Sequence, residues 1–328
     1  MSDKRGVCVG LSALLILGCA GEAPNTPAVR ASRSPDLASE PAPAKMRALE
    51  GADPLENVIE VRPGVYSGSA PMDEEGFRAL RRLGVRSVIS VDGARPEAEL
   101  ARAHGIETTH IPLRYSGIEP AQRAQLARAM RDAAWPVYVH CHHGKHRGPA
   151  AVAAALIGLG RMDRAEGERL MELAGTSRAY AGLWASVRTC EALGEAAIDA
   201  AGAGKAGEDT GANQGANHGV DMGEAMARME RSWYRLLDAR ERGWSADPGG
   251  RASAPVEYAG DITETMRALA SDASFEGESE DFRARMLRAI EQAAALERAI
   301  EIGDAAEAEA RFEALGASCR SCHRVYRD

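Results

Sequence analysis

Hydrophobic positions recur along this chain with two different spacings, which divide it into two parts. Between residues 55 and 194, short β-branched apolar runs alternate with amphipathic helical patterns. The runs fall at 65–68, 86–91, 108–113 and 137–140, and the helical patterns at 73–83, 96–104, 120–133, 149–159, 163–174 and 180–193. This order predicts an α/β domain, a mostly parallel sheet with helices on both faces, with ligands at the carboxyl ends of the strands.

Residues 219–328 carry the helical spacing alone. Apolar positions three and four residues apart mark four amphipathic stretches, at 222–242, 255–270, 281–302 and 305–326. Four such stretches joined by loops predict an all-α four-helix bundle as the second domain.

Three segments lack either spacing. Residues 19–54 are rich in Pro, Ala and Ser and predict a disordered tether, and residues 195–218 are rich in Ala and Gly and predict a flexible linker. Residues 1–18 form a signal peptide in which Lys4 and Arg5 precede the apolar run 7–17. The sequence Ile-Leu-Gly-Cys at 16–19 resembles a bacterial lipobox, which implies cleavage before Cys19 and acylation of that residue. We therefore expect a periplasm-facing lipoprotein of the bacterial cell envelope, held to the membrane by an N-terminal lipid anchor; an ordinary cleaved signal is the alternative.

Composition narrows the class of protein. The 328 residues carry a formal net charge of −8, and aromatic residues make up 5% of the chain. This balance does not favour a nucleic-acid partner. The cysteines stand at positions 8, 19, 141, 190, 319 and 322, and all but Cys190 belong to separate sequence motifs. We therefore do not expect a disulfide framework.

The sharpest chemistry lies between the strand at 137–140 and the following helix. Cys141 ends the strand, and Arg147 stands six positions later, at the start of the helix. Backbone N–H groups of such a loop and of the helix N-terminus attract an anion, and a guanidinium can hold two phosphate oxygens. The same field favours the thiolate, the nucleophilic form of a cysteine.

The pattern His-Cys-x5-Arg resembles the signature of cysteine-dependent phosphatases, and the surrounding strands are similar to the atypical dual-specificity family, particularly its plant-and-fungi type. The resemblance implies that Cys141 attacks phosphorus, that Arg147 clamps the phosphoryl oxygens and that His140 orients the loop. It also implies phosphate binding by the loop as a whole: His142, His143, Gly144, Lys145, His146, Arg147 and Gly148. With so many basic side chains, the loop favours a densely charged phosphate substrate; a metal site is the rival interpretation of its histidines.

Two departures from the family pattern concern catalysis. Gly148 follows Arg147, so the hydroxyl that the family often places beside the arginine is missing. The general acid is also open: Asp92 and Glu119 are the candidates, but Asp92 could simply form an Asp-Gly turn and Glu119 could cap the next helix. Cys190 is either a redox partner of Cys141 or a buried small side chain.

A second motif stands near the C-terminus. Cys319-Arg320-Ser321-Cys322-His323 is the attachment sequence of haem c, and its place on the last of four helices resembles the cytochrome c′ family. The resemblance implies thioether bonds from Cys319 and Cys322 and an axial nitrogen from His323. Met226 is a possible sixth ligand, although a methionine on that face could equally belong to the core, and an open sixth position would bind a small gas. A redox or zinc Cys-x-x-Cys is the alternative for the motif.

Together these features predict an exported phosphatase that hydrolyses phosphate monoesters through Cys141 and carries a haem domain for electron transfer, redox or gas sensing. Its partners would be a phosphorylated protein or small molecule and a redox partner or gas. The alternative is a periplasmic haem electron carrier whose phosphatase-like domain binds phosphate without catalysis.

Overall fold

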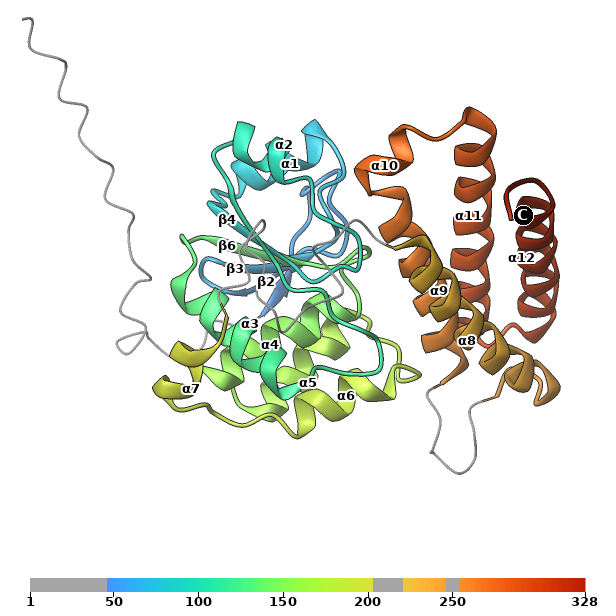
Figure 1. Ribbon diagram of the computed structural model, residues 1–328. Coiled ribbons are helices and arrows are strands. Elements are labelled where there is room, and N and C mark those ends of the chain that lie inside the picture. Colours follow the sequence, from blue (N-terminus) through green and yellow to red (C-terminus); the bar gives the residue numbers. More distant parts are fainter. Residues whose placement is uncertain (1–45, 203–220, 246–253, 328) are drawn as a thin grey trace, which may run out of the picture. The chain divides into compact units, whose positions relative to one another are not determined.

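The computed structural model describes residues 46–202, 221–245 and 254–327 (Figure 1), and all of these belong to one unit of the chain. The predicted signal peptide, Cys19 and most of the predicted tether and linker lie outside the described residues.

Six strands of the described residues form one mixed sheet, in the order β1-β2-β3-β6-β4-β5. They are β1 Arg47–Ala48, β2 Ile59–Arg62, β3 Val65–Gly68, β4 Ser87–Ser90, β5 Glu107–His110 and β6 Val137–His140. From β3 to β5 the neighbours are parallel, and β2 and β1 extend the β3 edge antiparallel. Gly68 and Ser90 both pair with His140, so β3, β4 and β6 end at the same edge of the sheet, immediately before Cys141.

Helices cover both faces of this sheet because its strand residues alternate between two cores. Val88 and Tyr138 pack with Phe77 of α1, whereas Ile89 and Val139, the next residue of each strand, pack with the helices of the opposite face. One face is covered by α1 Glu74–Arg82 and α2 Ala98–Ala103; the other by α3 Pro120–Asp132, α4 Arg147–Gly158, α5 Arg164–Leu173 and α6 Ala181–Arg188. The predicted α/β fold class is confirmed.

The α/β part extends beyond the predicted bounds. β1 begins before residue 55, and helix α7 Glu195–Ala200 stands where the linker was predicted to begin. The helix packs on α3: Ile198 is buried, and Arg131 forms a salt bridge with Asp199 (2.8 Å). A helix of six residues is too short to show a helical period in the sequence and depends on such tertiary contacts.

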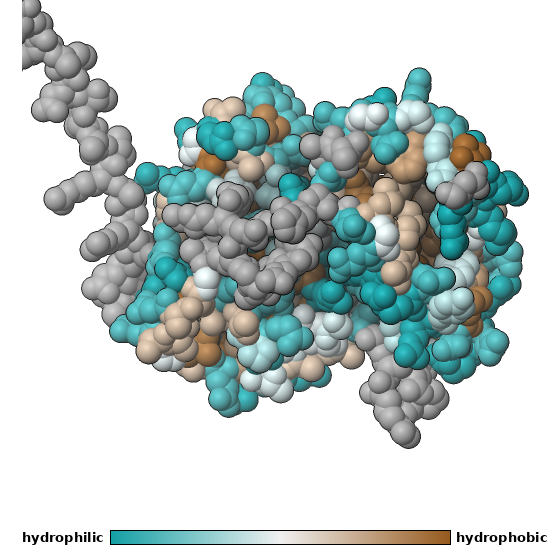
Figure 2. Space-filling view, viewed as in Figure 1, coloured by the Kyte–Doolittle hydropathy of each residue, from teal (hydrophilic) through white to brown (hydrophobic). Residues whose placement is uncertain are grey.

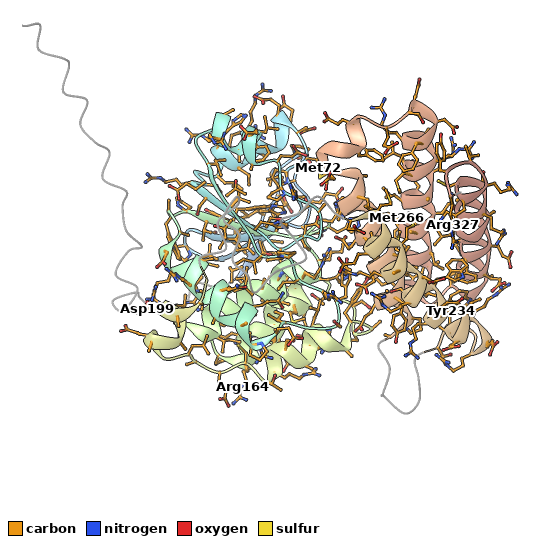
Figure 3. The ribbon with its side chains drawn as sticks, viewed as in Figure 1. Met72, Arg164, Asp199, Tyr234, Met266 and Arg327 are labelled. Carbon is orange, nitrogen blue, oxygen red and sulfur yellow. The ribbon has the colours of Figure 1, made fainter. Side chains whose placement is uncertain are left out.

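The second part is a helix bundle, as predicted. Its helices are α8 Met222–Glu241, α9 Pro255–Ala270, the single-turn α10 Ala273–Glu276, α11 Glu280–Ile302 and α12 Ala305–Tyr326. α8 packs on α9, α9 on α11 and α11 on α12. Their apolar stripes form one core that includes Met229, Leu236, Met266 (labelled in Figure 3), Leu296 and Phe312.

Bundle residues also contribute to the core of the α/β part. Val256 of α9 is fully buried in the core under α3–α6, and Ile300 of α11 packs at its border. Two bundle helices therefore approach the sheet edge that carries Cys141.

The described surface is largely polar. On the face shown in Figure 2, hydrophilic residues predominate and hydrophobic ones gather in small separate groups. Within the described ranges, none of the helices combines the length and hydrophobicity that crossing a bilayer requires.

Candidate functional site

The loop between β6 and α4 brings a thiol and a guanidinium into one buried site. Cys141 is 3% exposed at the end of β6, and Arg147, the first residue of α4, is 1% exposed. The turn between them requires Gly144, which has φ +71°. A Cβ at Gly144 would lie 2.3 Å from the Gly68 carbonyl carbon, so the loop can pack against β3 only with glycine there.

Neighbouring segments hold the outer side of the loop through its carbonyl groups. The Ala70 N–H donates to the His142 oxygen (3.0 Å), and the Asn57 side-chain amide donates to the His143 oxygen (2.8 Å). The Thr176 hydroxyl donates to the Lys145 oxygen (2.5 Å). With these carbonyls bound outside, the loop is fixed before any ligand arrives.

Arg147 is the most heavily contacted side chain of the site. Its guanidinium lies over the Tyr115 ring (4.3 Å to the centroid) and donates to the Tyr115 hydroxyl (3.3 Å) and to Asp92 Oδ1 (3.2 Å). Its Nε–H has no hydrogen-bond partner among the described residues although it is buried. An unpaired buried donor beside a loop of this shape indicates a place for an anion.

The structure distinguishes the two candidate general acids. Asp92 lies at the end of β4 and contacts Arg147; its burial acts to raise its pKa, but a hydrogen bond with Glu264 and the charges of Arg147 and Arg267 hold the pKa below its usual range. Asp92 is therefore ionised at neutral pH. Glu119 is exposed, and it lines a cavity of about 550 Å³ that reaches Arg147.

Glu119 also stands at the N-cap of α3. There its own N–H donates to the Gln122 side chain (3.0 Å). The position therefore serves the helix start, whatever the carboxylate does.

The histidines of the loop contribute less positive charge than the sequence indicated. Burial lowers the pKa of His140 to about 3, and burial together with the charge of Arg267 lowers that of His142 to about 3. The pKa of His143 is lowered for the same reasons. These rings are neutral at pH 7, so the arginines and Lys145 provide the charge. No group of three or more His, Cys, Asp or Glu side chains in the described part of the chain is placed to hold a metal ion.

The hydroxyl missing beside Arg147 has a possible counterpart on β3. A Cβ at Gly148 would lie 3.7 Å from Cys141 Sγ and 3.4 Å from Ser67 Oγ. The Ser67 hydroxyl is buried and has no hydrogen-bond partner among the described residues. Cys190, by contrast, is buried with its thiol directed to the Ala154 oxygen (3.7 Å), which fits a packing role.

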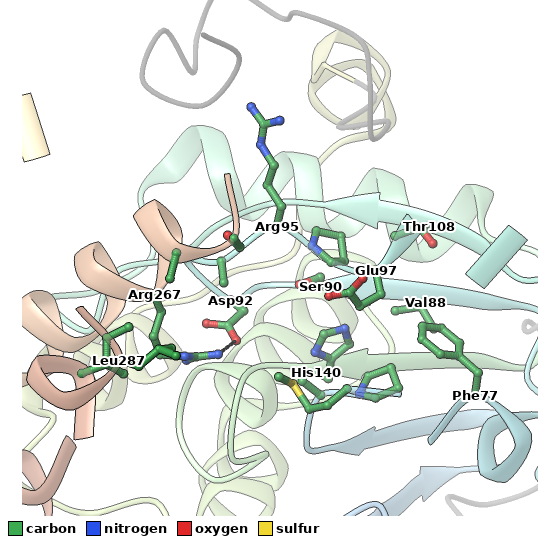
Figure 4. A pocket seen from close by; sticks show the side chains of 18 residues that line it. Phe77, Val88, Ser90, Asp92, Arg95, Glu97, Thr108, His140, Arg267 and Leu287 are labelled. Carbon is green, nitrogen blue, oxygen red and sulfur yellow. Dashed lines mark hydrogen bonds and ion pairs between the residues drawn. The ribbon is translucent and has the colours of Figure 1, made fainter. Parts of the chain in front are cut away.

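Several charged residues at the site come from the bundle and were not predicted. Glu264 and Arg267 of α9 contact Arg147 and Asp92, and Figure 4 shows the Arg267–Asp92 ion pair (3.2 Å). Glu301 and Glu297 of α11 bind His146 (3.0 Å) and the Tyr180 hydroxyl (2.9 Å). On an amphipathic helix such residues look like solvent-facing charges; the only sequence signal was Gly260, an isolated glycine inside a helical pattern.

The C-terminal motif lies in a second cavity, of about 790 Å³, within the bundle. Cys319, Cys322 and His323 of α12 line it, and so does Met226 of α8. The rest of its wall is mostly apolar and includes Met229, Trp233, Ile262, Met266, Phe282 and Leu315. The volume is within the range of small-molecule and cofactor pockets, and the combination of two thiols, an imidazole and apolar walls fits a haem.

A hydrogen-bonded network fixes the end of α12 that carries this motif. Arg285 of α11 donates to the Ser321 hydroxyl (2.7 Å) and to Asp281 (2.6 Å), and the Tyr326 hydroxyl donates to the same Asp281 (2.9 Å). Because Ser321 lies between the two cysteines, the network sets the position of both thiols.

The last part of the chain matches a known family. Residues 259–327 match the family model of Cytochrome C′, which implies a haem cofactor. The matched residues lie in the part that the sequence analysis predicted to be similar to cytochrome c′. No curated protein is similar enough to the sequence to count as a match.

Solved structures resemble the α/β part. TpbA of P. aeruginosa is 20% identical, with 48% of this chain and 94% of that chain covered and a TM-score of 0.40. A putative phosphatase from Shewanella putrefaciens is 18% identical (44% and 94% covered, TM-score 0.36). The catalytic core of the PP-IP phosphatase SIW14 from S. cerevisiae is 20% identical (37% and 77% covered, TM-score 0.33).

Proposed function

We propose that this protein hydrolyses phosphate monoesters through a Cys141 phospho-enzyme intermediate and carries a c-type haem on the same chain. The observation that supports the proposal most directly is the loop itself: Cys141 and Arg147 are buried together, the turn is fixed by Gly144, and the Arg147 Nε–H is unpaired. A phosphoryl group has the charge and geometry to take up that donor and the N–H groups of the loop.

The reaction has two steps. The Cys141 thiolate attacks phosphorus, the ester P–O bond breaks, and the leaving oxygen takes a proton from an acid. Water then attacks the thiophosphate, which releases inorganic phosphate and restores the thiolate. Arg147 stabilises the charge on the phosphoryl oxygens in both steps.

Glu119 is the better of the two candidates for the acid. It lines the cavity that reaches Arg147, whereas Asp92 is held ionised by two guanidinium groups and has no proton to give at neutral pH. We therefore propose that Asp92 positions Arg147 and that Glu119 protonates the leaving oxygen.

The test is turnover of p-nitrophenyl phosphate by the full-length protein. We expect Cys141→Ser to abolish turnover while inorganic phosphate still binds, and Glu119→Gln to lower kcat without lowering phosphate affinity. Because p-nitrophenolate is a good leaving group, the Glu119→Gln loss should be larger with phenyl phosphate. Unchanged turnover in Cys141→Ser would exclude the phospho-enzyme mechanism.

For the bundle we propose covalent haem c, with thioether bonds from Cys319 and Cys322 and His323 as axial ligand. The cavity lined by these three side chains supports this assignment. When bound, the haem supplies an iron for electron transfer or for binding a small gas. We expect the Soret band to remain with the protein after acid-acetone extraction, and to be extracted from the Cys319→Ser, Cys322→Ser double variant. Full extraction of the band from the unaltered protein would contradict covalent attachment.

We also propose that the protein is exported and anchored at the periplasmic side of the bacterial cell envelope through acylated Cys19. The support is the sequence of residues 1–19 and the need of haem c attachment for an exported chain. Cys19→Ser should then move the protein from the membrane fraction to the soluble periplasmic fraction; membrane retention of the variant would refute the anchor.

One observation favours the second candidate, a haem electron carrier whose α/β part binds phosphate without catalysis. Both terminal nitrogens of Arg147 are already engaged, by Asp92 and Glu264. Phosphate binding without turnover on any phosphomonoester would establish that candidate.

A further inference from the structure

The contact between Arg147 and Glu264 has the geometry of bound phosphate. Arg147 Nη2 lies 2.9 Å from Glu264 Oε1, and Arg147 Nη1 donates to Glu264 Oε2 (3.2 Å). The two terminal nitrogens of the guanidinium thus hold two oxygens of one acidic group. Arginine binds carboxylates and phosphates alike in this bidentate arrangement.

Glu264 is held in this place from several sides. Its Oε2 accepts a hydrogen bond from the Gly93 N–H (3.1 Å), and its Oε1 pairs with Arg267 (2.8 Å). Arg267 in turn pairs with Asp92. Asp92, Glu264, Arg147 and Arg267 thus form a closed, buried cluster between α9 and the loop of residues 141–147, called the phosphate loop below. Burial and the nearby Asp92 raise the pKa of Glu264, and the charge of Arg147 opposes this rise.

Glycines allow the close approach that this cluster needs. A Cβ at Gly93 would lie 2.8 Å from Glu264 Oε2, and a Cβ at Gly260 would lie 2.7 Å from the Tyr115 ring. Both distances are shorter than ordinary van der Waals contact: a side chain at Gly93 would displace the Glu264 carboxyl group, and one at Gly260 would press α9 away from the buried Tyr115 ring. The contact is therefore complementary in shape as well as in charge.

We infer that Glu264 is an internal anion that competes with substrate phosphate for Arg147, so that the bundle keeps the phosphate loop closed until α9 moves. This inference rests on the proposed function, because Glu264 would regulate the anion site at which phosphate is proposed to bind. A phosphate that binds Arg147 through both terminal nitrogens would have to displace the Glu264 side chain from them. Ile262 and Met266 of the same helix line the cavity that carries Cys319, Cys322 and His323, so one helix reaches both sites.

The test measures inorganic phosphate binding to the full-length haem-loaded protein by titration calorimetry, in a Cys141→Ser background that cannot turn over. Glu264→Gln keeps the shape of the side chain and removes its charge. We expect it to raise phosphate affinity at least about tenfold, a difference of about 1.4 kcal/mol. Glu291→Gln, the same change at an exposed position of α11, should leave the affinity unaltered.

A second variant acts on the same contact without changing charge. Gly260→Ala places a Cβ against Tyr115 and should also raise phosphate affinity, and alanine favours the helix by roughly 1 kcal/mol, so α9 itself is not weakened. Unaltered or weaker phosphate binding in Glu264→Gln would overturn the inference; if that variant does not fold, Gly260→Ala decides by the same criterion.

Turnover of p-nitrophenyl phosphate by the same variants with Cys141 restored separates the two proposals. Tighter phosphate binding without turnover would reject catalysis and leave the internal anion in place. Turnover with unaltered phosphate affinity in the Glu264→Gln variant would support catalysis and reject the internal anion.

Discussion

Gly144 offers a direct test of how the phosphate loop is built. Its φ of +71° is in the left-handed region, and an added Cβ would lie 2.3 Å from the Gly68 carbonyl carbon and 2.5 Å from the Ser69 nitrogen. The conformation costs an alanine about 1–2 kcal/mol, and the overlap with β3 backbone adds about 1–3 kcal/mol. Gly144→Ala should therefore lower the free energy of unfolding by about 2–5 kcal/mol.

Gly160 is the matched control, because it has φ +67° and nothing within 4 Å of an added Cβ. Gly160→Ala should lose only the conformational cost of about 1–2 kcal/mol. Urea unfolding of both variants gives the difference, and calorimetry should show that Gly144→Ala alone loses phosphate binding. Equal losses of stability in the two variants, or unaltered phosphate affinity in Gly144→Ala, would refute the proposed packing of the loop against β3.

Three further predictions concern single side chains. Burial raises the pKa of Glu297 from 4.5 to about 7, so the free energy of unfolding falls as pH rises through that interval, by about 3 kcal/mol at about 1.4 kcal/mol per pH unit. Urea unfolding at pH 5 and pH 8 should show this loss in the unaltered protein and little of it in Glu297→Gln. Equal losses in both proteins would contradict the burial argument. Met226→Leu should alter the absorption spectrum of the reduced haem while Met229→Leu on the same helix does not; identical spectra would exclude Met226 as the sixth ligand. Ser67→Ala should lower turnover about tenfold without lowering stability, because its unpaired buried hydroxyl and Cys141 Sγ both lie within 4 Å of the position that a Cβ at Gly148 would take. Undiminished turnover would leave the hydroxyl without a catalytic role.

Local patterns predicted most of the fold. The β6 strand was predicted at its observed bounds, and so were α9 and α12, because a β-branched run before a cysteine and a long apolar stripe are strong signals. β1, β2 and α7 were not predicted. They are two to six residues long: β1 pairs with β2, β2 pairs with β3, and α7 packs on α3. So short an element gives no clear periodic pattern in the sequence.

The candidate site was predicted only in part for a similar reason. Cys141 and Arg147 belong to one continuous loop, so their spacing in the sequence already implied their proximity. Asp92 was identified as a candidate, but its ionised state depends on Arg267, 175 residues further along the chain. The expectation of a basic, histidine-rich mouth does not hold for His142 and His143, because burial in the folded protein lowers their pKa and keeps the rings neutral.

The sequence by itself predicted the two fold classes, the proximity of Cys141 and Arg147, and the Cys-x-x-Cys-His motif at 319–323. Each depends on residues that are close in sequence or on a period repeated over several turns. Only the tertiary structure decided what Arg147 contacts. Glu264 is 117 residues away from Arg147 in the sequence and belongs to the helix bundle. The sequence does not say whether a charged residue of a helix faces solvent or another part of the protein. A buried charge must be paired because removing it from water is costly, and Arg147 becomes buried beside Glu264 only when α9 packs against the loop.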